Sequence, residues 1–430
     1  MLADEPRVGK TGAAIMACDL TLAQSILVVT TASGRAVWRR AFGDWSQFPR
    51  TVSVLTKDTD PATTDIVIVS WNGTVSPKIR AKLLARDFDR VILDESHYAK
   101  SVEAKRTHST IGAIMDDGAE LVQRGALCNR ASGRVWYLTG TPMPNAPNDL
   151  YPMLRASNPQ ALRSDPERGW PDVTKYNDFL HRYCVVKMKK ISNFRKIPVV
   201  IGGRNLPELK ARIDGFIMLR TQQDVGIREP IHELMPLAVS PAMRRAAEAD
   251  VNVAEVLAAA EANDTKTLEM HMGPLRRLTG ALKAKAVVEA VKEEFECGTD
   301  KIVLAYWHKE VGDALAEGLA SYGVLQIDGS TPAKDRGQIE QEFLHNKSAR
   351  VFLGQIAAAG EAIDLSAAAT LWFVETSFVP AQMKQMALRI TNYTQTRQAI
   401  VRVCVLEGSI DEALQLVLLR KWTAIREVLQ

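Results

Sequence analysis

The chain has 430 residues, of which 46% are hydrophobic and 24% charged, and its formal net charge is only +4. This is the composition of an ordinary globular protein of about two or three domains, and the mild charge permits nucleic-acid binding without arguing for it. The five cysteines are scattered without metal-ligand spacing, and no apolar stretch approaches the roughly 18 residues of a transmembrane helix, which excludes cysteine-based metal sites and membrane spans. Without a secretory signal, we expect an intracellular protein, cytoplasmic if it is prokaryotic or viral.

A phosphate-binding loop is predicted at Asp4–Thr11, almost at the start of the chain. Gly9 lets the backbone approach phosphates, Lys10 can reach the β- and γ-phosphates, and the Thr11 hydroxyl can hold Mg²⁺. The helical pattern that starts at Gly12 places a helix N-terminus behind the anion. The loop therefore predicts binding of a nucleotide with its magnesium ion.

Two features of this loop are unusual. Asp4 stands where the strict pattern has a glycine, and no strand is predicted before the loop. We therefore expect either an incomplete N-terminus or another kind of support for the loop.

Four apolar, β-branched runs alternate with helical patterns in the first part of the chain. This alternation predicts a doubly wound parallel sheet with helices on both faces. Trp38 and Trp45, in the helical run after the first strand, are expected in the core. The predicted strands are Ser25–Thr30, Asp65–Ser70, Val91–Leu93 and Val135–Leu138.

Asp94 and Glu95 directly follow the buried run Val91–Leu93. Ligands bind at the carboxyl ends of strands in open α/β sheets. A solvated strand end is the plain alternative, but a phosphate loop in the same domain favours catalysis. We predict that Asp94 holds Mg²⁺, usually through water, and that Glu95 orients the attacking water.

The segment Thr139–Pro142 completes a recognisable set. Alone it is a turn; together with the phosphate loop and the box Asp94–His97 it resembles motifs I, II and III of superfamily-two helicases. The sequences of these motifs are most similar to those of the Swi/Snf-type DNA translocases. Ile327–Pro332 is similar to the corresponding motif of their fork-remodelling, annealing-helicase branch. The resemblance covers nearly the whole chain, in the family's order, and implies two RecA-like domains that use ATP and Mg²⁺ on DNA.

In the first domain, the resemblance implies contacts to the DNA backbone at the ends of strands. Thr31 and Ser33 match motif Ia, Ser70 matches motif Ib, and Thr141 belongs to motif III. Ser33 is also expected to cap the following helix. His97 alone would be a packing residue, but the family uses it to couple the nucleotide site to motif III.

Between residues 156 and 280 the strand–helix alternation stops. A basic run such as Lys187–Lys190 is usually a solvated face. Its place in the family is a helical insertion that lies over DNA, which implies nucleic-acid contacts for Lys189 and Lys190. Residues 241–262 are rich in alanine and glutamate and are also predicted to be helical.

A second α/β domain is predicted over residues 281–430, against 1–155 for the first. The motif containing Ser330 matches the family closely, and the resemblance implies a nucleic-acid contact for this serine. His308 sits where motif IV has a polar residue, although a helix start is an equal alternative. In the motif V segment, small residues let the backbone approach a DNA phosphate and Gly360 supplies a permissive turn. The resemblance implies that Gly360 also binds the nucleotide, and Asp364 replaces the usual asparagine.

The motif VI segment departs most from the family. The resemblance implies that Gln385 and Arg389 contact the nucleotide. The family has a second arginine three residues later, which reaches the γ-phosphate; here Asn392 takes its place, and Thr394 replaces a glycine. Hydrolysis is therefore expected to be slow unless another cation, first of all Arg389, substitutes.

We thus predict two RecA-like α/β domains with a helical insertion, forming a monomeric, ATP-dependent translocase on duplex or forked DNA that contacts mainly phosphates and no membrane. Lys10, Thr11, Asp94 and Glu95 carry the phosphate and metal chemistry, and Arg389 stabilises charge from the second domain. One alternative is a strand-separating helicase acting on DNA or RNA. The other is a nucleotide-gated DNA-binding module with weak or no hydrolysis, which the motif VI substitution and the unusual N-terminus favour.

Overall fold

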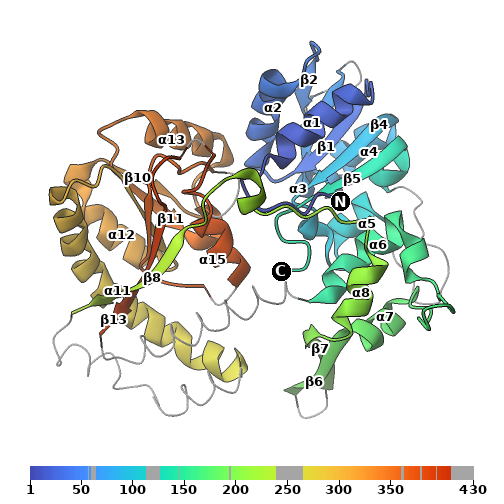
Figure 1. Cartoon of the computed structure of the whole chain (residues 1–430). Coiled ribbons are helices and arrows are strands. Elements are labelled where there is room, and N and C mark those ends of the chain that lie inside the picture. Colours follow the sequence, from blue (N-terminus) through green and yellow to red (C-terminus); the bar gives the residue numbers. More distant parts are fainter. Residues whose placement is uncertain are drawn as a thin grey trace. The chain divides into compact units, whose positions relative to one another are not determined.

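The computed structural model describes residues 1–56, 58–59, 64–112, 126–144, 146–192, 195–238, 265–359, 363–377, 380–393 and 395–407. The chain forms two compact units, Met1–Thr221 and Gln222–Gln430, each built on its own sheet (Figure 1). None of the helices in these ranges is long and apolar enough to cross a membrane.

The first unit contains a five-stranded parallel sheet in the order β2-β3-β1-β4-β5. Successive side chains of a strand point to opposite faces, and both faces of this sheet are covered. Ile26 and Val28 pack with Trp38 in one core cluster, while Leu27 and Val29 belong to a second cluster on the opposite face. The strands are β1 (Ile26–Thr30), β2 (Val52–Val54), β3 (Ile66–Ser70), β4 (Phe88–Asp94) and β5 (Ala131–Leu138).

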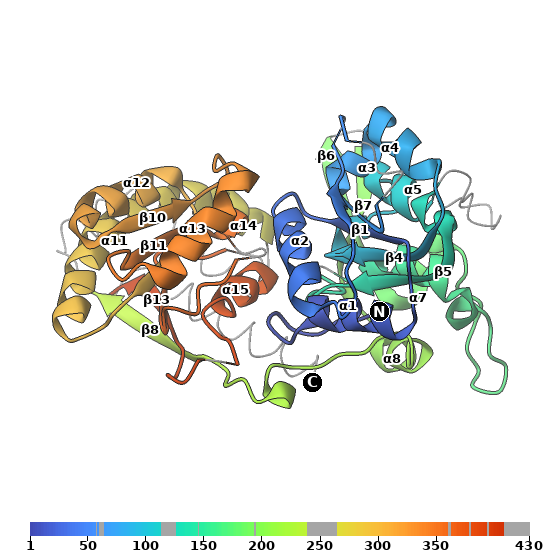
Figure 2. The ribbon, with the colours of Figure 1, turned by 90° about the horizontal axis from the view of Figure 1, so that it is seen from above.

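The helices of this unit lie on both sides of the sheet, as the view from above shows (Figure 2). Helices α1 and α2 supply the core cluster on one face, and α3 and α4 supply the other. Their bounds are α1 (Lys10–Leu20), α2 (Gly34–Trp45), α3 (Trp71–Val75), α4 (Pro77–Leu84) and α5 (Lys105–Thr110), with short 3-10 helices η1 (Ser96–Ala99) and η2 (Leu127–Arg130). The predicted doubly wound sheet is confirmed.

The segment before the phosphate loop is extended and paired on both sides. Leu2 N donates to Tyr137 O (2.8 Å), and Thr139 N donates to Leu2 O (3.0 Å). On the other side, Ala3 N donates to Met218 O at 2.8 Å. The loop is therefore supported by pairing to β5 and to residues 216–220.

Residues 146–221 complete the first unit instead of forming a separate insertion. Phe179, Tyr183 and Leu209 are buried in the same core cluster as the sheet. The elements are η3 (Pro147–Leu150), α6 (Tyr151–Ser157), η4 (Pro159–Leu162), α7 (Tyr176–Tyr183), β6 (Cys184–Ser192), β7 (Arg195–Gly203) and α8 (Leu206–Arg212).

This arrangement corrects two expectations. The predicted limits at residues 155 and 280 do not match the division of the structure at Thr221, because the apolar side chains after residue 155 complete the first core. The basic run Lys187–Lys190 was expected in a helical insertion but lies in the antiparallel hairpin β6–β7. The residues that flank the run, Val185, Val186 and Ile191, are β-branched, which favours an extended chain. The predicted helix 241–262 lies outside the described residues.

The second unit contains a six-stranded parallel sheet in the order β10-β11-β9-β12-β13-β8. The strands are β8 (Ile231–Leu237), β9 (Ile302–Tyr306), β10 (Val324–Ile327), β11 (Val351–Gln355), β12 (Thr370–Phe373) and β13 (Ile400–Leu406). β8 precedes the predicted second domain in sequence, yet it pairs with β13 along its whole length.

Two core clusters again cover the two faces of this sheet. Val291 and Leu315 of α11 and α12 pack with Leu304 on one face, and Phe343 and Met386 of α13 and α15 pack with the other. The helices are α11 (Thr265–Glu296), α12 (Lys309–Gly318), α13 (Ala333–His345), α14 (Ile356–Ala359) and α15 (Pro380–Ala387), with η5 (Gln223–Val225) and η6 (Ala320–Tyr322). The chain is thus of the predicted fold class, with two parallel sheets flanked by helices.

Candidate nucleotide and nucleic-acid site

The phosphate loop curls around the amine of Lys10. Gly9 has φ 97° and Arg7 has φ 70°, so the chain turns through the left-handed region twice before α1 begins. Lys10 Nζ donates to the carbonyl oxygens of Asp4 (2.6 Å) and Glu5 (3.0 Å). The backbone amides of the first turn of α1 lie at the N-terminus of this helix, which is the arrangement that anion binding requires.

The structure explains why an aspartate stands at position 4, where the strict phosphate-loop pattern has a glycine. Its side chain is fully buried, and it accepts hydrogen bonds from Arg220 N (3.0 Å) and from Arg220 Nε (3.1 Å) and Nη2. The carboxylate that replaces the expected glycine therefore anchors the loop to the end of the first unit. Arginine suits this role because its guanidinium can donate two parallel hydrogen bonds to one carboxylate.

Asp94 closes β4 and is fixed by three neighbouring elements. Its Oδ2 accepts from Thr30 Oγ1 (2.7 Å) and Trp38 Nε1 (2.8 Å), and its main-chain oxygen accepts from Trp71 Nε1 (2.9 Å). Burial and the adjacent charge of Glu95 raise the pKa of Asp94, and outweigh these hydrogen bonds and the charge of Lys10. A divalent cation at this carboxylate would restore its ionised form, so the donor set fits Mg²⁺.

Glu95 and His97 connect the acidic box to the end of β5. Glu95 is in the left-handed conformation (φ 49°), which turns its carboxylate toward His97 Nδ1 at 3.3 Å. The same nitrogen lies 3.1 Å from Thr139 Oγ1 and 3.5 Å from Thr141 Oγ1. The structure therefore brings together the histidine and both threonines that the sequence singled out.

The hydroxyl groups at the ends of β1 and β3 act as helix caps. Gly34 N donates to Thr31 Oγ1 (3.0 Å), whereas Ser33 makes no capping bond with its side chain. The expectation that Ser33 caps α2 is therefore wrong; the threonine two residues earlier does so, and its hydroxyl also pairs with Ser33 Oγ (3.1 Å). Ser70 Oγ accepts from Gly73 N at 3.1 Å and caps α3.

The remaining predicted residues belong to the second unit or to the hairpin. Ser330 is exposed, and its N and Oγ donate to Asp328 Oδ1 (2.8 and 2.6 Å). Gln385 lies in α15, half-buried. Lys189 and Lys190 lie in β6, and Gly360 is outside the described residues.

Arg389 follows α15, with a side chain only 7% exposed. Its main-chain oxygen accepts a hydrogen bond from Leu365 N (3.1 Å), which ties the motif VI segment to the motif V segment. The two substituted positions of these motifs also meet, because Asn392 Nδ2 donates to Asp364 Oδ2 at 3.4 Å. Asn392 further donates to Ser366 Oγ at 3.4 Å.

Sequence reasoning missed three members of the site and misplaced one residue. Thr30, Trp38 and Trp71 position Asp94. The only hint in the sequence is that Thr30 and Trp71 lie at or just after a strand end, whereas Trp38 lies inside α2. Trp45 was expected in the core but is 51% exposed. Its helical spacing resembles that of a core residue, but it is the last residue of α2, where the helix leaves the sheet.

A surface hollow of about 550 Å³ lies on the first unit, along α2 and the segment that follows it. It is lined by Arg39, Gly43, Gln47, Phe48 and Arg50, among others. None of the predicted site residues lines it.

Comparison with known proteins gives two family matches. Residues 1–226 match the SNF2-related domain, and residues 283–412 match the helicase conserved C-terminal domain. Together they span both units and include every predicted catalytic residue.

Among curated proteins, the chain is 26% identical over 437 residues to the SWI/SNF-related matrix-associated actin-dependent regulator of chromatin subfamily A-like protein 1 of Xenopus tropicalis, covering 99% of this chain and 42% of that protein. It is 24% identical to the DNA annealing helicase and endonuclease ZRANB3 of Mus musculus, covering 98% of this chain and 38% of that protein. The chain thus spans about two fifths of the length of these relatives. Among solved structures, the Sulfolobus solfataricus SWI2/SNF2 ATPase core in complex with dsDNA is a distant likeness, with 19% identity, a TM-score of 0.41, and coverage of 99% of this chain and 87% of that chain.

Proposed function

The chain belongs to the SNF2-related family, and from this premise we propose that it is an ATP-dependent translocase that moves along or remodels double-stranded DNA. The observation that supports this most directly is the pairing of a lysine-centred phosphate loop with two carboxylates at the end of β4. Phosphoryl transfer needs little from a protein beyond positioning and charge stabilisation, and these residues supply both.

In this proposal, Gly9, Lys10 and Thr11 bind the phosphates of ATP. Thr11 and Asp94 hold Mg²⁺, which when bound neutralises charge on the phosphates. The raised pKa of Asp94 supports this assignment, because a carboxyl group that resists ionisation in the protein alone is suited to a bound cation. Glu95 orients the attacking water.

We assign DNA contacts to hydroxyl and lysine side chains that sit at strand ends and in the β6–β7 hairpin. Hydroxyls and lysines bind phosphate oxygens without reading base sequence. The residues are Thr31, Ser33, Ser70, Thr141, Lys189, Lys190 and Ser330. The track is duplex or forked DNA, the protein acts as an intracellular monomer, and no membrane is involved.

Coupling between the nucleotide and the track would run through His97. Its Nδ1 contacts the carboxylate of Glu95 on one side and Thr139 and Thr141 on the other. A change in the charge around Glu95 during hydrolysis would therefore alter the hydrogen bonds of His97, and through them the position of the motif that carries Thr141.

From the second unit, Gln385, Arg389 and Gly360 are the proposed nucleotide contacts. Arg389 is the candidate for stabilising charge in the transition state, because Asn392 is neutral and its amide faces Asp364 and Ser366. This substitution is the observation that keeps a second candidate function open, a nucleotide-gated DNA-binding module with weak or no hydrolysis.

The test is phosphate release by the wild-type chain and by Lys10→Ala, each without DNA and with single-stranded, duplex or forked DNA. We expect release to be stimulated by duplex or forked DNA and to be abolished in the variant. Equal release by both forms would contradict the phosphate-loop assignment. DNA affinity that changes with ATP while no phosphate is released would favour the binding module, and displacement of a labelled strand would favour a strand-separating helicase.

A further inference from the structure

Trp45 is a large aromatic residue left half-exposed beside the phosphate loop. It ends α2 and is 51% exposed. A Cβ built on Gly12 would lie 3.0, 3.1 and 3.2 Å from the ring atoms Cδ2, Cε2 and Cε3 of Trp45. Three nearly equal distances to atoms around the fused bond mean that the face of the indole rests on Gly12, which leaves indole surface open to solvent.

Gly12 is part of the predicted nucleotide site by position. It follows Lys10 and Thr11 directly and lies in the first turn of α1, the turn whose amides face a bound phosphate. Gly12 is buried and has no side chain, so the ring of Trp45 occupies space that a side chain at this position would need. An open aromatic surface therefore stands immediately beside the place where the phosphate loop would hold its anion.

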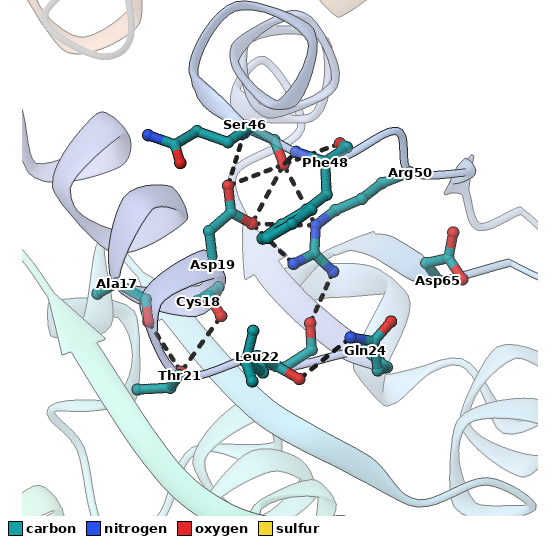
Figure 3. A network of polar contacts seen from close by, with 12 residues as sticks. Ala17, Cys18, Asp19, Thr21, Leu22, Gln24, Ser46, Phe48, Arg50 and Asp65 are labelled. Carbon is teal, nitrogen blue, oxygen red and sulfur yellow. Dashed lines mark hydrogen bonds and ion pairs between the residues drawn. The ribbon is translucent and has the colours of Figure 1, made fainter.

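The segment that carries Trp45 is fastened to α1 at a second point (Figure 3). Asp19, near the end of α1, accepts from Ser46 Oγ (3.2 and 3.1 Å), Gln47 N (2.7 Å), and Arg50 Nε (3.2 Å) and Nη2 (2.7 Å). Arg50 Nη1 also donates to Ala23 O at 2.6 Å.

The hydrogen bonds that Asp19 accepts also keep its carboxyl group ionised. Burial alone would raise the pKa of Asp19, but the hydrogen bonds from Arg50, Gln47 and Ser46 outweigh it and lower the pKa. The carboxylate is thus charged at neutral pH and holds the residues that follow Trp45. A ring held in place before the ligand arrives loses little conformational entropy on binding.

We propose that Trp45 is the platform on which the base of the bound nucleotide stacks. The inference rests on the proposed function, because it takes the phosphate loop to be the site of the triphosphate. A nucleotide is the ligand class that combines an anionic chain with a planar aromatic ring, and the structure places an anion cradle and an open indole side by side. Base stacking on an aromatic side chain is tolerant of base identity, so this contact adds affinity with little preference among bases.

A protein partner is the competing occupant of this surface. Met16 and Leu20 follow Gly12 at helical spacing and are 42% and 85% exposed, so apolar surface continues along α1. The close approach of the ring to the first turn of α1 favours the nucleotide, because a docking surface would not need the phosphate loop. The experiment below separates the two.

The experiment measures binding of Mg-ATP and of magnesium tripolyphosphate, which lacks base and ribose, by calorimetry. The variants are Trp45→Ala, Trp45→Leu, which keeps apolar packing on Gly12, and Trp45→Phe, which keeps a stacking ring. Phe48→Ala is the matched control, since Phe48 is an exposed aromatic residue three positions further along the same segment. Thermal unfolding of each variant verifies the fold.

We expect Trp45→Ala and Trp45→Leu to weaken ATP binding by on the order of tenfold and to leave tripolyphosphate binding unchanged. Trp45→Phe should retain most of the affinity for ATP, and Phe48→Ala all of it. The proposal is overturned if Trp45→Leu binds ATP as the wild type does, or if it loses both ligands equally. If Lys10→Ala leaves the binding of both ligands unchanged, the proposed function fails at the phosphate loop and the base platform falls with it. If Lys10→Ala loses both ligands while every Trp45 variant matches wild type, only the base platform is wrong.

Discussion

Both sheets carry a carboxylate at or just after the carboxyl end of an interior strand, but the two carboxylates have different hydrogen-bond partners. In the first unit, Asp94 is the last residue of β4 and receives hydrogen bonds from Thr30 and Trp38, while burial and the adjacent Glu95 raise its pKa. In the second unit, Glu375 follows β12 and is 3% exposed. It accepts from Trp307 N (2.8 Å), His308 N (2.9 Å) and His308 Nδ1 (2.6 Å).

The difference shows that the position at a strand end does not by itself make a catalytic carboxylate. Glu375 receives two amides and an imidazole from the segment after β9, so the protein itself meets its need for donors. Asp94 has a second carboxylate beside it, and a cation is the partner that would relieve both. This contrast supports the proposal that metal chemistry takes place in the first unit, and we propose a structural role for Glu375.

The largest expected effect is on hydrolysis in the first unit. Glu95→Gln should lower DNA-stimulated ATP hydrolysis by about a thousandfold while Mg-ATP still binds, because the amide cannot act as a base toward water. Asp94→Asn should lose the magnesium dependence of nucleotide binding as well. Steady-state phosphate release and calorimetry with and without Mg²⁺ measure the two effects. If Glu95→Gln loses nucleotide affinity as severely as Asp94→Asn, the proposed division of roles is wrong.

Glu375→Ala should act on stability instead of chemistry. It leaves two amides and the His308 ring without their buried acceptor, which should lower the free energy of unfolding of the second unit by about 3 kcal/mol. Denaturant unfolding measures this, and ATP binding by the folded protein serves as the control. A variant of normal stability but no hydrolysis would place Glu375 in the catalytic machinery and contradict the contrast drawn above.

A smaller effect is expected where the two substituted motif positions meet. Asn392→Arg alone should change the hydrolysis rate little, because the new guanidinium would pair with Asp364, which Asn392 now contacts. Combined with Asp364→Asn, the arginine is released from this partner, and the rate should rise by on the order of tenfold or more if motif VI supplies charge to the transition state. Asp364→Asn alone is the control. Equal rates in all four forms would show that the missing arginine does not limit hydrolysis.

The smallest effect concerns pH. The pKa of Asp94 is raised in the folded protein, so its contribution to stability is present below the ordinary aspartate pKa, near 4, and is lost as the pH rises through the folded value. Without Mg²⁺ the free energy of unfolding should therefore decline across this window, and Mg²⁺ or Asp94→Asn should flatten the decline. Asp19 is the opposite case, because its pKa is lowered in the folded protein. Its contribution to the free energy of unfolding is present above the ordinary aspartate pKa and is lost as the pH falls. A pH profile that Mg²⁺ does not alter would argue against metal binding at Asp94.

Most strands, the phosphate loop and the acidic pair could be predicted from the sequence, because each is indicated by a pattern of a few adjacent residues. Runs such as Ile26–Thr30 are apolar and β-branched throughout, which indicates a strand buried on both faces without knowledge of its partners. The phosphate loop and the acidic pair were found in the same way, since Gly9-Lys10-Thr11 and Asp94-Glu95 carry their chemistry within a few residues. These predictions needed only the spacing of residue types along the chain.

What the tertiary structure alone decided depends on residues far apart in sequence. Leu2 is strand-like because Tyr137 and Thr139 are beside it, and Asp4 can replace a glycine because Arg220 meets its carboxylate. No local pattern contains such a partner. The exposure of Trp45 has the same origin: its sequence neighbours are those of a core helix, but where α2 leaves the sheet is set by packing on α1, so the residue ends beside Gly12 instead of inside the core. Local propensity determined the elements, and the free energy of burying and pairing distant side chains determined which of their residues face the site.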